Sequence, residues 1–408
     1  MKGNYVFHID VNNAFLSWTA VFLLENGYNK DIRKVPSVIG GDPKTRTGIV
    51  LAKSPVAKKY GIVTAETLYS ARKKCKDLEV YPPDYKWYYK KSRELMDYLK
   101  QYSPIQEQLS IDECFLDMSG MKYIYDDLIK LAHHIKDEVK EKFGYTVNIG
   151  IGNNKLCAKM ASDFEKPDKV HTLLKDEIAT KLWPLDVGEL FMCGKRTKAE
   201  LNKLNIYTIK DLAHKDKKYL ERHFKAQGTY LYNACRGIDT SLVEETHSKN
   251  QSISVTETMP HDYSDRDELK AIIFRQTEEV TRELRSKNLY VKTVGVIFKN
   301  NNFISYSAQA TLNKPTDNTK EILKKIYEVF DNNYKDDEIR LIGVRLANLT
   351  KDKTEQISIF DTESREKEDN IQKTIDNINN RFGKSLIKPA SLELINGKKS
   401  KKSYMEKK

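Results

Sequence analysis

The segment LSIDECFLDMSG, residues 109–120, places two adjacent acids, Asp112 and Glu113, in an apolar run that otherwise has the pattern of a strand. Ile111 and Phe115 flank the pair, so a solvated strand edge does not explain it. Buried carboxylates without a partner are costly, and the pair therefore needs a neutralising group. Mg²⁺ meets this need, because it prefers hard oxygen ligands and uses few protein carboxylates. The fold must therefore leave room for a metal ion beside a core strand.

A third acid, Asp10, ends the apolar segment YVFHIDV, which predicts a buried strand. Considered alone, a carboxylate between a strand and a helix favours a helix cap. Together with Asp112 and Glu113, it favours a two-metal centre for phosphoryl transfer. Neighbours on a regular strand point to opposite faces, so the adjacent acids can share one site only at a bend or hairpin end. Ser110, directly before Ile111 and the pair, is compatible with a bend.

The composition limits the possible class of protein. The chain has 408 residues, 39% of them hydrophobic, and a formal net charge of +12. This apolar content excludes a disordered chain, and the length suggests roughly two to four domains. The basic charge favours nucleic acid first and an anionic membrane second. No apolar run approaches the roughly 20 residues that span a bilayer, and the N-terminus lacks the features of a signal peptide. The five cysteines form no CxxC pair, which favours reduced thiols in the cytosol over a zinc site.

Changes of pattern divide the chain into segments. Up to residue 173, predicted strands and helices alternate. Residues 174–240 are helical and rich in lysine, and the polar, aperiodic stretch 241–251 favours a linker. Residues 252–350 predict a small α+β domain in the order strand, helix, two strands, helix, strand. Residues 351–408 are polar and charged, and their final lysines favour either a DNA-binding arm or a solvated tail.

Three segments, HIDVNNAF, LSIDECFLD and AKMASDFEKP, together resemble the Y-family, or translesion, DNA polymerases over roughly residues 4–350. The resemblance implies that Asp10, Asp112 and Glu113 are catalytic carboxylates that bind two Mg²⁺ ions. The backbone carbonyl of Val11 is implied as a further ligand. In such a site, one ion lowers the pKa of the primer 3′-hydroxyl and the other stabilises the triphosphate and the leaving oxygens.

The resemblance also implies nucleotide contacts. Phe15 falls where the family keeps an aromatic steric gate against the ribose 2′-hydroxyl, although an ordinary core aromatic is the alternative. Lys166 falls where a lysine reaches the incoming triphosphate, and a surface lysine before a proline is the alternative. Lys53 and Lys58 are further candidates for phosphate contacts.

Two departures from the family pattern accompany these residues. Many members have Tyr-x-x-Arg in the fingers, whereas this chain has Pro55 and Lys58, and a lysine lacks the bidentate fork of arginine. This departure and the long tail favour the UmuC/UvrX-type branch over the DinB branch. The Gly or Asn that usually follows the Lys-Pro motif is replaced by Asp168.

The resemblance implies an α+β multidomain fold, namely a right-hand polymerase with a ferredoxin-like palm, small fingers, a helical thumb with a helix-hairpin-helix, and an α+β little finger. The implied bounds are 1–11 and 76–173 for the palm, 12–75 for the fingers, 174–240 for the thumb, 241–251 for the linker, 252–350 for the little finger, and 351–408 for the tail.

DNA contacts are predicted in two segments. Residues 190–213 resemble a helix-hairpin-helix, in which backbone N–H groups at a helix start bind phosphate, although Met192 replaces a usual glycine and a simple αα-turn is the alternative. In the little finger, basic residues lie on predicted strands at odd spacings, so a bulge or strand end is needed for both members of each pair to reach DNA. The candidates are Gly194, Lys195 and Arg196 in the hairpin, and Lys292, Lys299, Arg340 and Arg345 in the little finger.

The peptide QISIF, with Gln356, Ile359 and Phe360, resembles the bacterial sliding-clamp-binding peptide, and a short locally packed strand is the alternative. Taken together, the sequence predicts a monomeric, cytoplasmic, nucleoid-associated bacterial DNA polymerase with no membrane partner. Its partners would be primer–template DNA, dNTP and a sliding clamp, and its roles DNA repair, damage tolerance and the SOS response.

Two other classes stay open from the sequence alone. The first is another two-metal phosphotransfer enzyme on a palm fold, such as a nuclease or nucleotide cyclase, which would leave the hairpin and the clamp-like peptide unexplained. The second is a catalytically degenerate DNA- or clamp-binding protein, against which the intact acids Asp10, Asp112 and Glu113 speak.

Overall fold

The chain divides into two units, each of which buries its own hydrophobic side chains. Residues 1–43 with 48–247 form the first unit, and residues 44–47 with 248–408 form the second. The structure, a computed structural model, describes most of both units. The described residues are 4–42, 46, 48–245, 252–352, 371, 374, 375, 377, 378 and 381.

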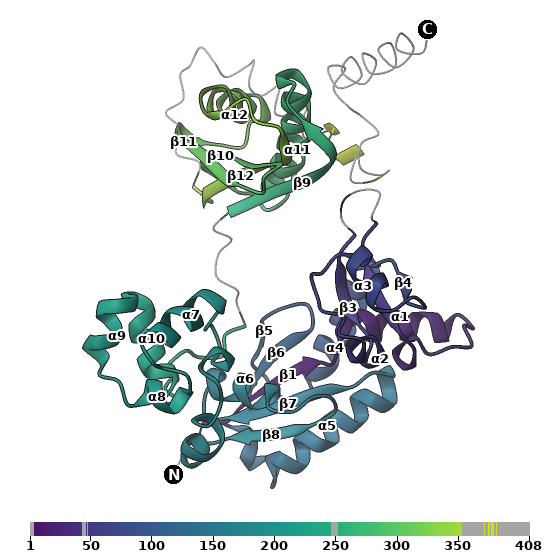
Figure 1. The fold of residues 1–408 in the computed structure, drawn as a ribbon, viewed down its shortest axis with the longest axis vertical. Helices are drawn as coiled ribbons and strands as arrows, with labels where there is room; N and C mark the ends of the chain where they lie inside the picture. Colours follow the sequence, from purple (N-terminus) through teal and green to yellow (C-terminus); the bar gives the residue numbers. More distant parts are fainter. Residues whose placement is uncertain are drawn as a thin grey trace. The chain divides into compact units, whose positions relative to one another are not determined.

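The first unit is built around a five-stranded sheet with the strand order β5-β6-β1-β7-β8 (Figure 1). β1 is antiparallel to both of its neighbours, β6 and β7, whereas β7 and β8 are parallel. The mixed sheet confirms the predicted α+β class and joins the first strand of the chain to strands more than 100 residues away. The strands are Val6–Val11 (β1), Gln106–Gln108 (β5), Glu113–Asp117 (β6), Val147–Gly152 (β7) and Val170–Leu173 (β8).

Strand β1 presents alternate residues to two different layers. Phe7 and Ile9 belong to the main core, which includes buried residues of α4 and α5. His8 and Asp10 face the opposite layer, where their side chains meet residues of α6. The period of two in a strand therefore places Asp10 away from the main core. The helices are Tyr85–Leu99 (α4), Leu128–Phe143 (α5) and Lys155–Asp163 (α6).

Helix α6 lies unusually close to β7, and two glycines permit this approach. A Cβ atom added at Gly150 would lie 2.0 Å from the carbonyl oxygen of Ala158 and 2.4 Å from the amide nitrogen of Ser162. At Gly152, it would lie 2.3 Å from the amide nitrogen of Ala158. The glycines therefore set the height of α6 above the sheet, and with it the position of the side chains that α6 directs at the acids.

We expect Gly150→Ala to destabilise the chain by about 3 kcal/mol, because helix and strand would have to separate to admit the methyl group. Urea denaturation followed by circular dichroism measures this change. Gly120→Ala is the matched control, since no atom would lie within 4 Å of its added Cβ. Equal stability of the two variants would show that the close approach is not required.

Residues 37–81 form a three-stranded sheet in the order β3-β2-β4, with its own small core. Strand β4 lies beyond residue 75, the predicted end of the fingers, and so inside the segment predicted as palm. Ser54 caps α2 by accepting a hydrogen bond from the amide of Ala57 at 2.9 Å, and Pro55 occupies the first turn, as the sequence predicted. The elements are Ala14–Glu25 (α1), Ile32–Lys34 (η1), Ser37–Gly40 (β2), Val50–Lys53 (β3), Pro55–Lys59 (α2), Leu68–Lys74 (α3) and Glu79–Tyr81 (β4).

The predicted thumb segment is helical and buries a separate cluster that includes Leu201, Leu212 and Leu231. Several short helices connect it to the sheet. The elements of this region and of the β6–α5 connection are Met121–Tyr123 (η3), Lys175–Glu177 (η4), Ile178–Leu182 (η5), Val187–Glu189 (η6), Lys195–Lys203 (α7), Ile209–Ala213 (α8), Lys217–Phe224 (α9) and Ala226–Ala234 (α10).

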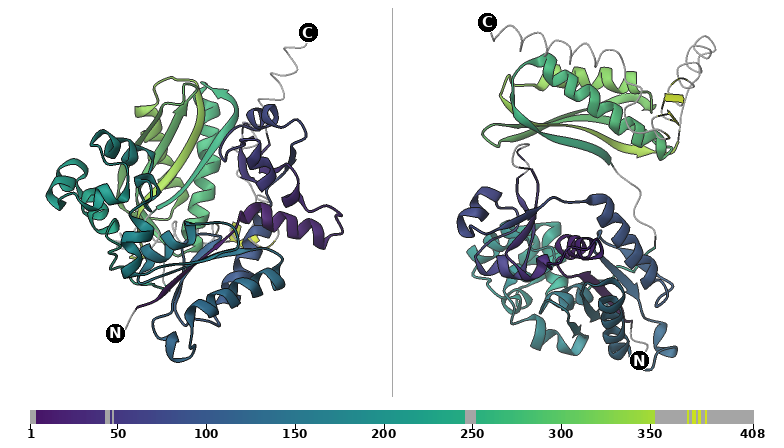
Figure 2. Two further views of the ribbon diagram at one scale, coloured as in Figure 1. Left: turned by 60° about the horizontal axis from the view of Figure 1, so that its bottom comes forward. Right: turned by 90° about the vertical axis from the view of Figure 1, so that its right-hand side faces the viewer.

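The second unit contains a four-stranded sheet in the order β11-β10-β12-β9. Helices α11 and α12 lie together on one side of the sheet, as the right-hand view of Figure 2 shows. Among residues 252–352 no helix covers the other side, which we call the open side. The predicted order of strands and helices is confirmed. The elements are Ser252–Tyr263 (β9), Arg266–Ser286 (α11), Tyr290–Asn300 (β10), Ser305–Thr316 (β11), Thr319–Asn333 (α12) and Ile339–Thr350 (β12). Among the helices of the described residues, none is both long enough and apolar enough to cross a lipid bilayer.

Candidate active site

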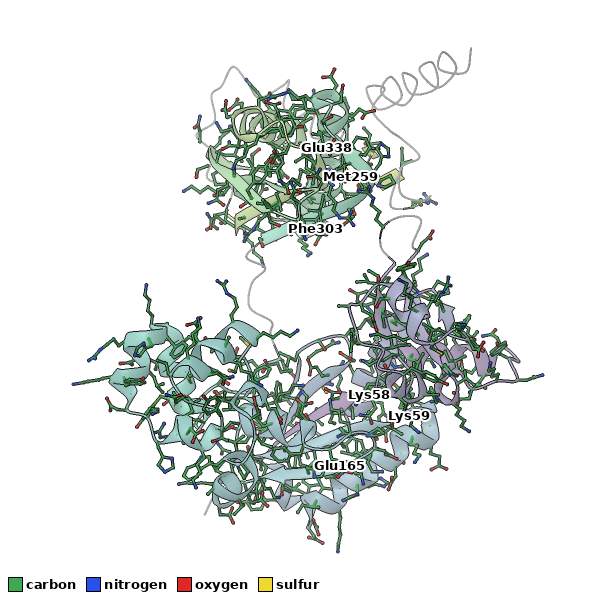
Figure 3. All side chains as sticks on the ribbon, viewed as in Figure 1. Lys58, Lys59, Glu165, Met259, Phe303 and Glu338 are labelled. Carbon is green, nitrogen blue, oxygen red and sulfur yellow. The ribbon has the colours of Figure 1, made fainter. Side chains whose placement is uncertain are left out.

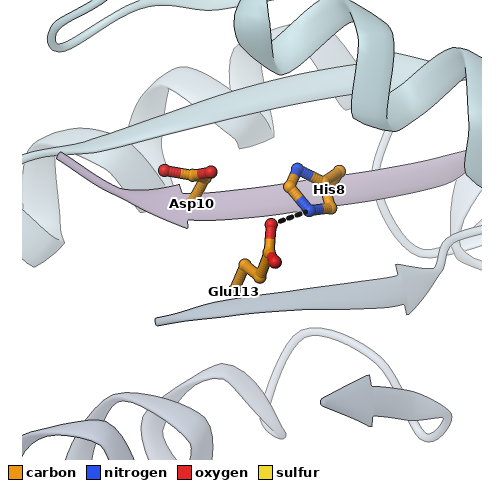
Figure 4. A group of neighbouring side chains, drawn as sticks. All are labelled: His8, Asp10 and Glu113. Carbon is orange, nitrogen blue, oxygen red and sulfur yellow. Dashed lines mark ion pairs between the residues drawn. The ribbon is translucent and has the colours of Figure 1, made fainter. Parts of the chain in front are cut away.

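Asp10 and Glu113 face each other across neighbouring strands. They are register partners in the β1–β6 ladder, and both side chains lie on the side of the sheet that α6 covers. Figure 4 shows Asp10 and His8 on β1 and the Glu113 carboxylate reaching toward His8. One ligand atom from each of these three residues lies within 4.8 Å of the others. The strand pairing thus brings together acids that are 103 positions apart.

Asp112 occupies the bend that joins β5 to β6. The amides of Leu109 and Ser110 both donate hydrogen bonds to the carbonyl oxygen of Glu113, at 3.0 and 3.3 Å. The carbonyl oxygen of Asp112 accepts a hydrogen bond from the amide of Val11 at 3.0 Å. The hairpin end that the adjacent acids required is therefore present, and it fixes Asp112 beside the end of β1.

The environments of the two adjacent acids differ. Burial raises the pKa of Asp112, and the negative charges of Asp10 and Glu113 raise it further, although the Ser110 hydroxyl donates a hydrogen bond to it at 2.6 Å. Burial alone would also raise the pKa of Glu113, but His8 and Lys159 outweigh it and lower that pKa to about 2. Among the described residues, no lysine or arginine forms an ion pair with Asp112. A divalent cation beside Asp112 would supply the missing positive charge.

His8 is fully buried behind Glu113. Its Nε2 atom lies 3.2 Å from Glu113 Oε2, and its Nδ1 atom lies 2.8 Å from the Ser162 hydroxyl on α6. Burial lowers the pKa of His8, so the neutral imidazole is favoured. The ring thereby links β1, β6 and α6 and restricts the rotation of the Glu113 carboxylate. The sequence analysis did not assign His8 a role, although its position two residues before Asp10 places it on the same strand face.

Two lysines reach the carboxylates from the segment AKMASDFEKP. Lys159 Nζ lies 2.7 Å from Glu113 Oε2 and 3.4 Å from Asp10 Oδ2. Lys166 Nζ lies 3.1 Å from Asp10 Oδ1, so this predicted residue does reach the acid cluster. Burial would lower the pKa of each lysine, but Glu113, Asp10 and Asp163 raise the pKa of Lys159, and Asp10 and Asp163 raise that of Lys166.

Lys159 was missed by the sequence analysis. The available signal was its helical spacing, four residues before Asp163, which places Lys159 and Asp163 on one face of the helix.

Asp168 stands where the family usually has Gly or Asn after the Lys-Pro motif, and its contacts explain why the loop accepts an aspartate. Its φ of 62° lies in the left-handed region, which aspartate enters more readily than most residues. Its carboxylate accepts hydrogen bonds from Lys136 at 2.9 Å and Lys140 at 2.8 Å, both on α5. Its amide donates to Asn12 Oδ1 at 2.9 Å. These contacts anchor the loop that carries Lys166.

Phe15 lies at the start of α1 and is half-buried. Its ring stacks on Tyr88 with 4.6 Å between centroids, and it meets the edge of Tyr85 at 6.1 Å. Stacking on a buried partner fixes the ring while part of it stays exposed. This geometry suits a steric gate as well as a packing role, and the gate stays a prediction.

Lys53 ends β3 and Lys58 lies on α2, both in the predicted fingers segment, and neither contacts the acid cluster among the described residues. Lys53 Nζ donates to Thr64 Oγ1 at 3.1 Å, and the carbonyl oxygen of Lys53 accepts from Asn13 Nδ2 at 2.6 Å. Burial lowers the pKa of Lys53, and the positive charge of Lys58 lowers it further, so the two ammonium groups influence each other. Lys58 is exposed on α2 (Figure 3).

The predicted hairpin of the thumb keeps its turn despite the missing glycine. Met192 has a φ of 63°, which is the conformation that a glycine would adopt without strain. Gly194 follows as the N-cap of α7 and supplies no side-chain hydrogen bond. Gly194, Lys195 and Arg196 are exposed, so the first amides of α7 are not covered by a capping side chain.

The odd spacings in the second unit coincide with irregular pairing. The β10 register shifts between Val291 and Thr293, around Lys292, and the β12 register shifts between Ile339 and Leu341, around Arg340. The strand pairing is therefore irregular at Lys292 and at Arg340, and the DNA contacts of these residues stay predictions.

Lys299 and Arg345, the other two candidates, lie on the open side of the same sheet. Lys299 Nζ lies 5.2 Å and the Arg340 guanidinium 4.8 Å from the ring centre of the exposed Phe303, which Figure 3 labels. Arg345 is exposed and lies opposite Gly295 in the pairing of β10 with β12. It helps to line a hollow of about 550 Å³ on the open side of the sheet.

Gln356, Ile359 and Phe360 lie outside the described residues.

Comparisons with known proteins place this geometry in a family. Residues 9–163 match the model of the impB/mucB/samB family, and residues 250–359 match the model of its C-terminal domain. Residues 192–239 match a model described as the thumb domain of DNA polymerase iota.

Curated relatives match over nearly their whole length. A DNA polymerase IV of Clostridium acetobutylicum is 43% identical over 386 residues, which cover 94% of this chain and 96% of the relative. A DNA polymerase IV of Alkaliphilus oremlandii is 35% identical, covering 95% of this chain and 98% of the relative.

A solved structure supports the fold. It is described as a Y-family DNA polymerase chimera, and it superimposes with a TM-score of 0.73 at 23% identity, covering 85% of this chain and 100% of that chain. The relatives, the matched family models and the converging acids agree: this chain belongs to the Y-family DNA polymerases.

Proposed function

We propose that the chain extends a DNA primer along damaged as well as intact templates, with low fidelity, and that Asp10, Asp112 and Glu113 hold two Mg²⁺ ions for this reaction together with the carbonyl of Val11. As a Y-family member, the chain is a DNA-directed DNA polymerase that binds primer–template DNA and dNTP. The convergence of three carboxylates, from β1, from the β5–β6 bend and from the start of β6, is the observation that carries the proposal.

The donor set fits Mg²⁺, because the acids offer hard oxygen atoms and Asp112 lacks a cationic partner among the described residues. When bound, the ions would lower the pKa of the primer 3′-hydroxyl and stabilise charge on the triphosphate. The carboxylates position the reacting groups, and Phe15 excludes the ribose 2′-hydroxyl. Lys166, reoriented from Asp10, contacts the triphosphate and stabilises its developing charge. Lys53 and Lys58 approach the triphosphate from the fingers.

We assign the five-stranded sheet to the palm, the β3-β2-β4 sheet to the fingers, helices α7–α10 to the thumb, and strands β9–β12 with α11 and α12 to the little finger. The proposed bounds are those predicted from the sequence, except that the fingers extend to include β4. The open amides of α7 at Gly194, Lys195 and Arg196 bind DNA phosphates. Lys292, Lys299, Arg340 and Arg345 grip the duplex backbone. Backbone contacts carry no base information, which suits an enzyme that accepts many templates.

Arg345→Ala should weaken binding to primer–template DNA by a similar factor for every sequence and reduce the slope of log affinity against log salt by about 1, because one phosphate contact is lost. Fluorescence anisotropy at several salt concentrations measures the slope. Lys324→Ala on α12 is the control, since it removes an exposed charge from a helix on the other side of the sheet. If the salt slope of Arg345→Ala equals those of the wild type and of Lys324→Ala, Arg345 does not contact DNA.

Four further assignments extend the proposal. The QISIF peptide with Gln356, Ile359 and Phe360 supports a sliding-clamp contact, which a peptide–clamp binding assay tests. The bacterial relatives support a cytoplasmic, nucleoid-associated protein. The monomeric state and the UmuC/UvrX-type branch, which depends on Pro55 and Lys58, complete the proposal.

Primer extension with Mg²⁺ and dNTP on an intact template and on a template with one defined lesion tests the proposed function. We expect the primer to lengthen on both templates. A shortened primer would indicate a nuclease, and a bound but unchanged primer would indicate a binding protein with a degenerate site. If extension always stops before the lesion, the proposal that the chain copies damaged templates is wrong.

A further inference from the structure

One ammonium group lies among three carboxylates at the candidate metal site. Lys159 Nζ is 2.7 Å from Glu113 Oε2, 3.4 Å from Asp10 Oδ2 and 3.5 Å from Asp163 Oδ2. The side chain is only 12% exposed. Two of these three acids, Asp10 and Glu113, are the ones that we assign to metal binding. The lysine therefore contacts the oxygen atoms that a divalent ion would need.

An ammonium group and a divalent ion in this position oppose each other. Both are positive, and like charges a few ångströms apart repel strongly where the surroundings are half-buried. Glu113 lies on β6 and Asp10 on β1, so a metal ion shared by them would have to occupy the space that Lys159 Nζ now bridges. The lysine side chain is flexible and can swing away on its four-carbon stem, whereas the strand-borne carboxylates are fixed by the sheet.

Without a positive charge in this place, the carboxylates would destabilise one another. Asp10 and Glu113 are register partners, Asp163 lies within reach of the same ammonium, and Asp112 adds a fourth negative charge close by. Lys166 neutralises the outer side of the cluster, through Asp10 Oδ1 at 3.1 Å and Asp163 Oδ1 at 2.8 Å. Lys159 neutralises the inner side, next to Glu113.

We propose that Lys159 is a built-in counter-ion of the active site, which holds Asp10 and Glu113 together when no divalent ion is bound and must leave this position when one binds. The inference rests on the proposed function, because it assumes that these acids are metal ligands. Lys159 stabilises the metal-free protein. Because a divalent ion must displace the Lys159 ammonium to bind, the same contacts lower the affinity for divalent ions.

Mn²⁺ binding to the full-length chain tests this linkage in the absence of DNA and nucleotide. Lys159→Met removes the ammonium and keeps most of the stem. We expect it to bind Mn²⁺ at least about tenfold more tightly than the wild type, because no like charge must be displaced. Electron paramagnetic resonance counts the free Mn²⁺ directly. In EDTA, Lys159→Met should melt at a lower temperature than the wild type. Added Mn²⁺ should raise the melting temperature of Lys159→Met by more than it raises that of the wild type.

Lys155→Met is the matched control. Lys155 is on the same helix, is similarly buried, and pairs with Glu107 at 2.9 Å, a residue outside the acid cluster. Its loss should lower the melting temperature equally with and without Mn²⁺ and leave Mn²⁺ affinity unchanged. Lys159→Gln, which also lacks the charge, replaces the methionine variant if that protein does not fold. Lys159→Arg, which keeps the charge, should retain the wild-type affinity.

An affinity of Lys159→Met equal to or below that of the wild type, including no detectable binding by either protein, overturns the counter-ion proposal. Glu113→Gln separates this failure from failure of the proposed function. If Glu113→Gln abolishes Mn²⁺ binding while Lys159→Met changes nothing, the metal site stands and only the counter-ion is wrong. If Glu113→Gln binds Mn²⁺ like the wild type, the metal assignment itself fails, and the counter-ion proposal fails with it.

Discussion

Asp112→Asn should reduce primer extension by at least about 1,000-fold, which corresponds to about 4 kcal/mol of lost transition-state stabilisation. The reason is that the substitution keeps the shape of the side chain but removes the negative charge that a metal ion would require. Binding of primer–template DNA should change by less than about twofold, because Asp112 lies in the β5–β6 bend and not on a predicted DNA surface. Single-turnover extension and fluorescence anisotropy measure the two quantities.

Asp117→Asn is the matched control for this experiment. Asp117 ends the same strand, β6, and is the register partner of Val6 at the far end of β1 from Asp10. Its carboxylate accepts a hydrogen bond from the amide of Ser119 at 2.9 Å, so it has a local structural role. If Asp112→Asn were as active as Asp117→Asn, Asp112 would not be a metal ligand.

Phe15→Ala should raise the use of ribonucleotides relative to deoxyribonucleotides by about 100-fold, because the loss of the ring opens space for a 2′-hydroxyl group. The stacking of Phe15 on Tyr88 at 4.6 Å holds the ring in one place, and a rigid ring excludes the hydroxyl better than a mobile one. The ratio of kcat/KM for a dNTP and the matching rNTP measures the change.

Phe22→Ala controls for the loss of an aromatic residue from the same helix. Phe22 is 38% exposed and packs on Trp87 with 5.1 Å between ring centres. Its variant should lower stability without changing sugar selection. Should both variants show the wild-type dNTP/rNTP ratio, Phe15 would be a packing residue and the steric gate would lie elsewhere.

Much of the fold could be predicted from the sequence, because its signals are local. The run from Val6 to Val11 is apolar enough to indicate a buried strand, and Ser54 with Pro55 indicates a helix start. The hairpin end at Asp112 followed from a single geometric rule, since adjacent strand residues cannot face the same site. The same rule called for a bulge or a strand end near Arg340, where the pairing of β12 with β9 is irregular.

The parts that could not be predicted depend on contacts between distant elements. Lys159 reaches Glu113 only because β6 pairs with β1 and because Gly150 allows α6 to approach β7. Asp168 is stabilised in its left-handed conformation by Lys136 and Lys140, which belong to a helix in another part of the sequence. No local pattern contains this information, so tertiary packing decides it.

The lysines predicted to contact the triphosphate also show that side-chain contacts could not be predicted from the local sequence. Lys166 was predicted to contact the triphosphate, and the structure places its ammonium against Asp10 instead. Both positions are compatible with one flexible side chain, because a phosphate and a carboxylate attract the same positive charge. Lys53 and Lys58 were predicted from the family resemblance alone, and their described contacts lie within the predicted fingers segment. Their reach toward a nucleotide stays a prediction.

Diffraction from crystals of the full-length chain with primer–template DNA, a non-hydrolysable dNTP analogue and Mn²⁺ tests the central claim most directly. We expect anomalous density for bound Mn²⁺ beside the carboxylates of Asp10, Asp112 and Glu113. Lys159 should then have moved away from Glu113. An ion position that excludes the Asp10 carboxylate, or Mn²⁺ bound at a different place on the chain, would contradict the account.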